Sequence, residues 1–158
     1  MKEREIKTVF TELSYDELTA DERRLVDLAR EYTFHSYAPY SNFKVGAAIL
    51  LENGEIVCGA NQENSAFPSG TCAERSACFS AGARFPGVPF RTIAIDARGV
   101  DDRELPMPVS PCGACRQALL EYEKLAGHPV EVLLVGHDAI YRLPSVKSLL
   151  PLAFVDIE

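Results

Sequence analysis

Two short segments organise this chain: Thr71-Cys72-Ala73-Glu74-Arg75 and Ser110-Pro111-Cys112-Gly113-Ala114-Cys115-Arg116-Gln117. Together they supply three cysteines and one glutamate. Three thiolates and a nearby carboxylate suit a zinc ion that keeps one coordination position open for water. An open position is typical of catalytic zinc, whereas structural zinc takes four protein ligands. The two other cysteines, Cys58 and Cys78, and the three histidines are poorly placed to supply a fourth ligand.

Both segments lie where helices are predicted to begin. Ser110 is a favourable N-cap and Pro111 suits the first helical position, so we expect a helix from there to Gly127. A second helix is predicted from about residue 72 to 83. Backbone amides and the positive end of a helix lower the pKa of a thiol. Two helix N-termini aimed at one point can therefore bring three thiolates to one metal ion.

Glu74 allows two interpretations. Thr71-x-x-Glu74 matches a capping box, in which the glutamate only satisfies a helix amide. Beside Cys72, however, the same carboxylate can take a proton from a zinc-activated water and pass it on, and we favour this catalytic role. Three thiolates on Zn²⁺ leave a net charge of about −1, which calls for a nearby cation. Arg75 is the preferred candidate, rather than a solvated surface arginine, and Arg116 is a weaker one.

Length and charge narrow the class of protein. The 158 residues suit one domain, and we divide the chain into an N-terminal extension, 1–19, and a zinc domain, 20–158. A net charge of −7 makes nucleic acid an unexpected partner. No apolar run reaches the ~20 residues that span a bilayer, so no membrane partner is expected. An odd number of cysteines and an N-terminus without an apolar signal core favour a reducing, cytoplasmic location.

Periodicity predicts alternating helices and strands. Residues 5–13 read as a strand or an ordered arm, and the Thr19/Glu22 capping box starts a helix over 20–36. Asn53-Gly54 predicts a hairpin turn with two positive φ angles, and Ser145 starts a short last helix to residue 150. Strands are expected over 44–51, 55–60, 91–97, 130–135 and 140–143. The order favours an α/β fold, a three-layer α/β/α sandwich around a mixed sheet of about five strands.

The cysteine segments resemble those of the zinc-dependent cytidine deaminases, specifically the small homotetrameric type. The wider deaminase signature is His-x-Glu followed by Pro-Cys-x-x-Cys. Here cysteine replaces the histidine, in Cys72-Ala73-Glu74, as is characteristic of the small tetrameric subfamily. Three further segments resemble the family in the same order: residues 38–48, 61–68 and 149–154.

The resemblance implies hydrolytic deamination of cytidine and 2′-deoxycytidine to uridine and 2′-deoxyuridine, with release of ammonia, in pyrimidine salvage. It implies that Glu74 carries protons while zinc-activated water attacks C4 of the base. The implied zinc ligands are Cys72, Cys112 and Cys115. It also implies a homotetramer with active sites at the subunit interfaces. The residues implied to bind the nucleoside are Phe43, Asn61, Glu63, Ala73 and, from a neighbouring subunit, Phe154.

Each of these nucleoside contacts has a simpler structural alternative. Phe43 suits core packing, Phe154 suits a C-terminal anchor, and Asn61 and Glu63 suit a polar turn.

The chain also departs from the family. About 19 residues precede the usual first helix, the segments 84–90 and 97–107 are long, and the chain stops four residues after Phe154. Position 67 is Phe where many relatives have Tyr.

Two alternative functions stay open. A blasticidin-type nucleoside-antibiotic deaminase has the same metal set, although Asn61-x-Glu63 and Arg75 favour cytidine. A non-enzymatic zinc-stabilised binding module would have no need of Glu74.

Overall fold

The fold is built on one six-stranded sheet with the strand order β1-β6-β5-β4-β2-β3. The computed structural model describes residues 1–155. Only β4 and β5 run parallel, and the other neighbours are antiparallel. The strands are β1 Thr11–Leu13, β2 Lys44–Leu51, β3 Ile56–Ala60, β4 Phe90–Arg98, β5 Glu131–Val135 and β6 Ile140–Leu143.

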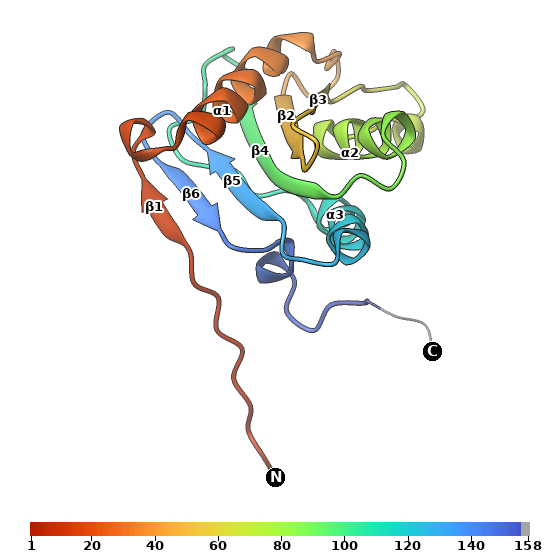
Figure 1. The fold of residues 1–158 in the computed structure, drawn as a ribbon. Coiled ribbons are helices and arrows are strands. Elements are labelled where there is room, and N and C mark those ends of the chain that lie inside the picture. Colours follow the sequence, from red (N-terminus) through yellow and green to blue (C-terminus); the bar gives the residue numbers. More distant parts are fainter. Residues whose placement is uncertain (156–158) are drawn as a thin grey trace.

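Three helices complete the sandwich (Figure 1). They are α1 Ala20–Tyr32, α2 Ala73–Arg84 and α3 Gly113–Ala126. Helix α1 packs with Ala48 and Ala94 on one face of the sheet. Ile49 and Ile93, their sequence neighbours, join the core shared with α2 and α3 on the opposite face. The predicted α/β/α sandwich with a mixed sheet is confirmed.

Helix α2 lies unusually close to the sheet, because its inner surface is made of small residues and faces a glycine of β3. A Cβ atom added to Gly59 would lie 2.5 Å from the amide nitrogen of Ala77 and 2.7 Å from the carbonyl oxygen of Ala73. Both alanines are fully buried. This contact fixes the height of α2 above the sheet, and with it the position of the residues at the start of the helix.

Several local predictions were wrong in detail. Of the residues 5–13 predicted as a strand or an ordered arm, only Thr11–Leu13 form a strand, β1, which pairs with β6 and brings the sheet to six strands. Helix α1 ends at Tyr32, and residues 33–35 continue it as a 3-10 turn. Among the described residues of the β2–β3 turn only Gly54 has a positive φ, at 85°, so this connection of four residues differs from the expected two-residue turn. The last helix is a 3-10 turn over Val146–Leu149.

An ion pair beside a buried acidic group anchors the long segment after β4. Asp96 is 1% exposed on the α1 face of the sheet. Burial, followed by the nearby negative charge of Glu104, raises the pKa of Asp96 to about 7. Glu104 in turn accepts a 2.8 Å hydrogen bond from the guanidinium of Arg30 on α1. The positive charge of Arg30 acts on both carboxyl groups. Its ion pair with Glu104 holds the segment that leads from β4 to Cys112 against α1.

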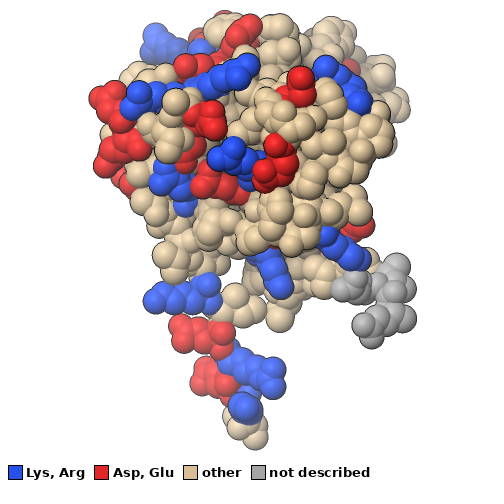
Figure 2. Space-filling view, viewed as in Figure 1, with Lys and Arg blue, Asp and Glu red and all other residues tan. Residues whose placement is uncertain are grey.

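The first ten residues extend away from the sandwich, and each of them is exposed (Figure 1). Two contacts tie this segment to the body: the Thr8 hydroxyl donates to the Ser148 carbonyl at 3.2 Å, and the Phe10 ring lies 4.8 Å from that of Tyr141. On the face shown in Figure 2, basic and acidic side chains are interspersed rather than gathered into a basic stripe. Within residues 1–155, none of the helices has the length and apolar character needed to cross a bilayer.

The contact at Gly59 gives a prediction for stability. Gly59→Ala should lower the free energy of unfolding by about 1–3 kcal/mol, because overpacking against backbone atoms forces α2 away from the sheet. Gly99→Ala is the control, since its added Cβ would meet only side-chain atoms, at 3.4 Å. Urea unfolding followed by circular dichroism measures both variants. Equal midpoints for the two variants would show that α2 can shift at no cost.

Candidate active site

The first segment forms the N-terminus of α2 with Cys72 at the N-cap position. Cys72 has extended backbone angles, and its carbonyl accepts the amide of Ser76 at 2.9 Å. Its side chain makes no capping hydrogen bond. Since the helix begins at Ala73 and not at Thr71, Glu74 does not form the capping box that its spacing from Thr71 allowed. The capping box that the sequence allowed is therefore absent.

The second segment forms the N-terminus of α3 in the same way. Cys112 is the N-cap, and Cys115, one turn later, is fully buried. The prediction that Ser110 caps this helix and that Pro111 is its first residue was wrong by two positions. Serine is preferred at N-cap positions, but in this helix Cys112 is the N-cap residue. Its thiol faces the other two thiols instead of the helix amides.

The two helix starts bring the three thiols together. The sulfur atoms of Cys72, Cys112 and Cys115 lie within 4.8 Å of one another, and those of Cys112 and Cys115 are 3.5 Å apart. Zn–S bonds of about 2.3 Å in a tetrahedron separate two sulfurs by about 3.8 Å, so the set fits zinc. Within residues 1–155 no histidine or carboxylate joins this group as a fourth ligand. The donor set therefore suits a zinc ion with one open position.

The charge at this cluster has a defined partner in Arg75. One guanidinium nitrogen of Arg75 lies 3.5 Å from the Cys72 sulfur. A hydrogen bond from the Cys115 thiol, with help from Arg75, lowers the pKa of Cys72 to about 5, whereas the pKa of Cys115 is raised. Arg116 does not take this role, because it donates to the carbonyl oxygens of Pro111 and Leu149 at 2.8 and 2.7 Å.

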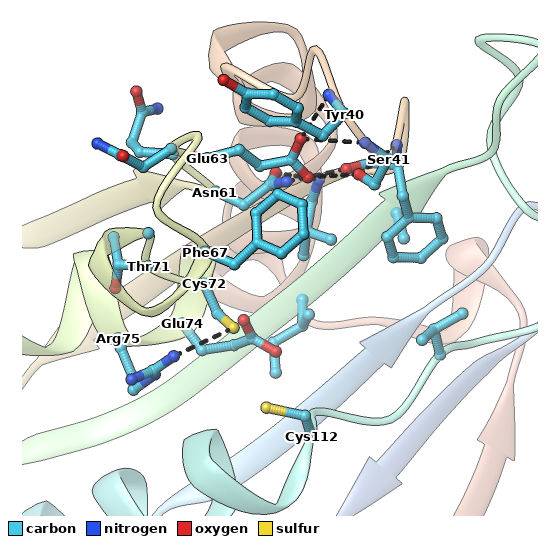
Figure 3. A pocket seen from close by; sticks show the side chains of 18 of the residues that line it. Tyr40, Ser41, Asn61, Glu63, Phe67, Thr71, Cys72, Glu74, Arg75 and Cys112 are labelled. Carbon is cyan, nitrogen blue, oxygen red and sulfur yellow. Dashed lines mark hydrogen bonds between the residues drawn. The ribbon is translucent and has the colours of Figure 1, made fainter.

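Glu74 is the carboxyl closest to the thiols. It is 5% exposed, and Figure 3 shows its carboxyl group turned toward the space between Cys72 and Cys112. Burial raises the pKa of Glu74 above its usual range, and the negative charge at Cys72 acts in the same direction. A raised pKa makes a carboxyl group better able to take up a proton and hold it for later release.

A cavity of about 750 Å³ opens above the thiols and Glu74. This volume falls in the range of small-molecule sites. Its opposite wall holds Phe43, Asn61 and Glu63, and at its mouth the rings of Tyr40 and Phe67 meet edge to face at 5.7 Å (Figure 3). The metal site and three of the predicted nucleoside residues therefore share one cavity.

Asn61 is held firmly on that wall. Its side-chain oxygen accepts from the Val45 amide at 2.8 Å and from the Ser36 hydroxyl at 2.7 Å. Its nitrogen donates to the Phe43 carbonyl at 2.8 Å, which leaves one N–H free to bond a ligand.

Two of the predicted nucleoside residues do not line this cavity. Ala73 is fully buried, and its side chain belongs to the core under α2. Phe154 is 65% exposed near α3, where its carbonyl accepts a 2.9 Å hydrogen bond from Gln117. Their roles in binding stay predictions.

Sequence reasoning missed the residues that support this wall. Ser36 holds Asn61, and Ser41 holds Glu63. Thr71 and Ser110 also line the cavity. Ser41 lies in the Ser41-Asn42-Phe43 turn, where serine and asparagine are common because they bond nearby backbone. That signal indicates a turn, but it does not show that the serine faces Glu63, which lies 22 residues later.

An α/β/α sandwich with three thiols and a buried glutamate at two helix N-termini defines a zinc-dependent deaminase. Comparison with known families agrees, since residues 19–126 match the model described as "Cytidine and deoxycytidylate deaminase zinc-binding region". The chain belongs to this family of zinc enzymes.

Individual relatives show the same similarity. The chain is 39% identical over 137 residues to the cytidine deaminase of Sporosarcina psychrophila, covering 85% of this chain and 91% of that one. It is 36% identical over 134 residues to the cytidine deaminase of Halalkalibacterium halodurans, covering 85% and 94%. A crystal structure of cytidine deaminase from Burkholderia pseudomallei matches with a TM-score of 0.70 and 38% identity, over 87% of this chain and all of that one.

The metal site gives a second prediction. The purified protein should hold about one zinc ion per chain, and Cys112→Ala should lose it, because two thiolates bind zinc much more weakly than three. Cys58→Ala is the matched control, since Cys58 lies in β3 outside the thiol group. Elemental analysis by mass spectrometry measures the metal. Full zinc content in Cys112→Ala would remove Cys112 from the ligand set.

Proposed function

We propose that this protein converts cytidine and 2′-deoxycytidine to uridine and 2′-deoxyuridine with release of ammonia, in pyrimidine salvage. The observation that carries the proposal is one cavity with two different walls. Cys72, Cys112 and Glu74 lie at one side, with Cys115 buried behind them, and Asn61, Glu63 and an aromatic ring lie at the other. Such a cavity suits a ligand with a base at one end and a sugar at the other. The relatives described above are cytidine deaminases, which supports the same substrate class.

Cys72, Cys112 and Cys115 would hold a zinc ion, which when bound would act as a Lewis acid and make a water molecule easier to deprotonate. In the proposed reaction Glu74 takes a proton from the attacking water, gives it to ring nitrogen N3 of the base, and later helps ammonia to leave. Its burial supports this role, because a raised pKa suits a group that must hold and release a proton. Arg75 offsets the negative charge of the thiolates from its position 3.5 Å from the Cys72 sulfur.

The residues that bind the sugar are assigned from the hydrogen-bonding groups on the opposite wall of the cavity. Asn61 and Glu63 bind the 3′-hydroxyl of the ribose, since the free N–H of Asn61 can donate to it and the carboxylate of Glu63 can accept from it. Phe43 packs against the nucleoside from the cavity wall, and Ala73 contacts the base.

We also propose that the enzyme is a cytoplasmic homotetramer with active sites at the subunit interfaces. Phe154 would then reach the cavity of a neighbouring subunit, which is consistent with its exposure and with its absence from the cavity of its own chain. The free thiols suit a reducing compartment. Residues 20–158 would form the catalytic domain, of which 156–158 lie outside the described residues, and 1–19 the extension. Light scattering on the zinc-loaded protein should give the mass of four chains.

Substrate identity is tested by comparing cytidine with blasticidin S. Ultraviolet absorbance should fall as cytidine becomes uridine, and blasticidin S should react much more slowly if at all. Turnover of blasticidin S without turnover of cytidine would identify an antibiotic deaminase. Full zinc content without turnover of any cytosine nucleoside would instead identify a binding module.

Glu74 is tested separately from the metal. Glu74→Gln should keep zinc and lower kcat by at least about 10²–10⁴-fold, because the amide cannot carry the proton. Glu63→Gln is a useful contrast, since its effect should fall mainly on KM. Near-normal kcat in the zinc-loaded Glu74→Gln variant would remove Glu74 from the mechanism.

A further inference from the structure

The carboxylate of Glu63 is held by the turn that precedes β2. Its Oε1 atom accepts from the backbone amides of Tyr40 and Ser41 at 2.9 and 3.1 Å. Its Oε2 atom accepts from the Ser41 hydroxyl. The Ser41 hydroxyl, followed by these backbone amides, lowers the pKa of Glu63, so the group stays ionised. Figure 3 shows these bonds on the cavity wall.

The Ser41 hydroxyl has a second bond that fixes its direction. It accepts the backbone amide of Phe43 at 3.0 Å, and Asn42 between them has a positive φ of 54°. A hydroxyl has one proton to donate, and here that proton goes to Glu63. A single hydroxyl thus links the carboxylate and the aromatic residue that face the ligand.

The hydrogen bonds that Glu63 already accepts leave one acceptor position of its carboxylate for a ligand. A carboxylate offers about four acceptor positions, of which Oε1 uses two and Oε2 uses one on this turn. The remaining position is on Oε2, the oxygen that Ser41 orients. Asn61 is fixed independently, by Ser36, Val45 and Phe43.

We propose that Ser41 is a positioning residue that gives the cavity its preference for nucleosides with a free 3′-hydroxyl. It does so by aiming the last acceptor position of Glu63 at that hydroxyl. The inference rests on the proposed function, in which Glu63 binds the sugar. Ser41 itself has no part in the proton transfers assigned to Glu74.

The test compares Ser41→Ala with Ser41→Thr, which keeps the hydroxyl on an exposed residue with room for one methyl group. Ser41→Ala should raise KM for cytidine about tenfold, because a hydrogen bond to a charged group is lost, while kcat changes less than about threefold. Ser41→Thr should restore most of the affinity. With 2′,3′-dideoxycytidine, which lacks the hydroxyl, wild type and Ser41→Ala should have similar KM values. Ser65→Ala is the matched control, since this exposed serine of the 61–70 loop does not line the cavity.

Binding of uridine and of 2′,3′-dideoxyuridine, measured by calorimetry, gives a readout without turnover, and thermal melting checks folding. An unchanged KM in Ser41→Ala, or an equal loss with the dideoxynucleoside, would overturn the positioning role. A wild type that turns over no cytidine would instead reject the proposed function. In that case the role of Ser41 would be tested by uridine binding alone. Equal affinities of wild type and Ser41→Ala for uridine would reject this role as well.

Discussion

The site depends on two helix N-termini that meet at one point. Cys72 and Cys112 occupy the N-cap positions of α2 and α3, and neither side chain makes a capping hydrogen bond to the backbone amides of its helix. Their sulfurs instead face each other and that of Cys115. The unbonded amides of each first turn leave partial positive charge there, which stabilises thiolates. Because α2 rests on β3 at Gly59, a shift of the helix would move Cys72 away from the other two thiols.

One helical turn carries three different functions. Cys72 can supply a zinc ligand, Glu74 points into the cavity, and Arg75 reaches back to the Cys72 sulfur. Residues 74 and 75 differ by about 100° around the helix axis, so a buried acid and a cation can follow each other in sequence and still face different groups. The Arg75 Nε atom is buried without a hydrogen-bond partner among residues 1–155, which indicates that proximity to the thiols outweighs its desolvation.

The sequence predicted well whatever depends on regular spacing. The strand over 44–51, the helix at Thr19 and the small residues of α2 were found because periodicity and capping are local. Ser110 was misread because capping preference competes with the grouping of three thiols, which only the tertiary structure shows. The short β1 was uncertain, since three residues pair with β6 by contacts about 130 residues away in sequence.

The polar wall was the hardest part to predict, because it joins loops through side chains. Ser36 to Asn61 and Ser41 to Glu63 are contacts across 25 and 22 residues, and neither follows a repeating pattern. The side of the cavity that holds the thiols is, by contrast, built from the N-termini of α2 and α3. The cysteine motifs at these two helix starts can be recognised in the sequence. The two walls are therefore separate structural units. In the proposed reaction the helix N-termini hold the groups that act on the base, whereas the turns at 36–45 and 61–63 hold the sugar. Substitutions in those turns can change the ligand and leave the metal chemistry intact.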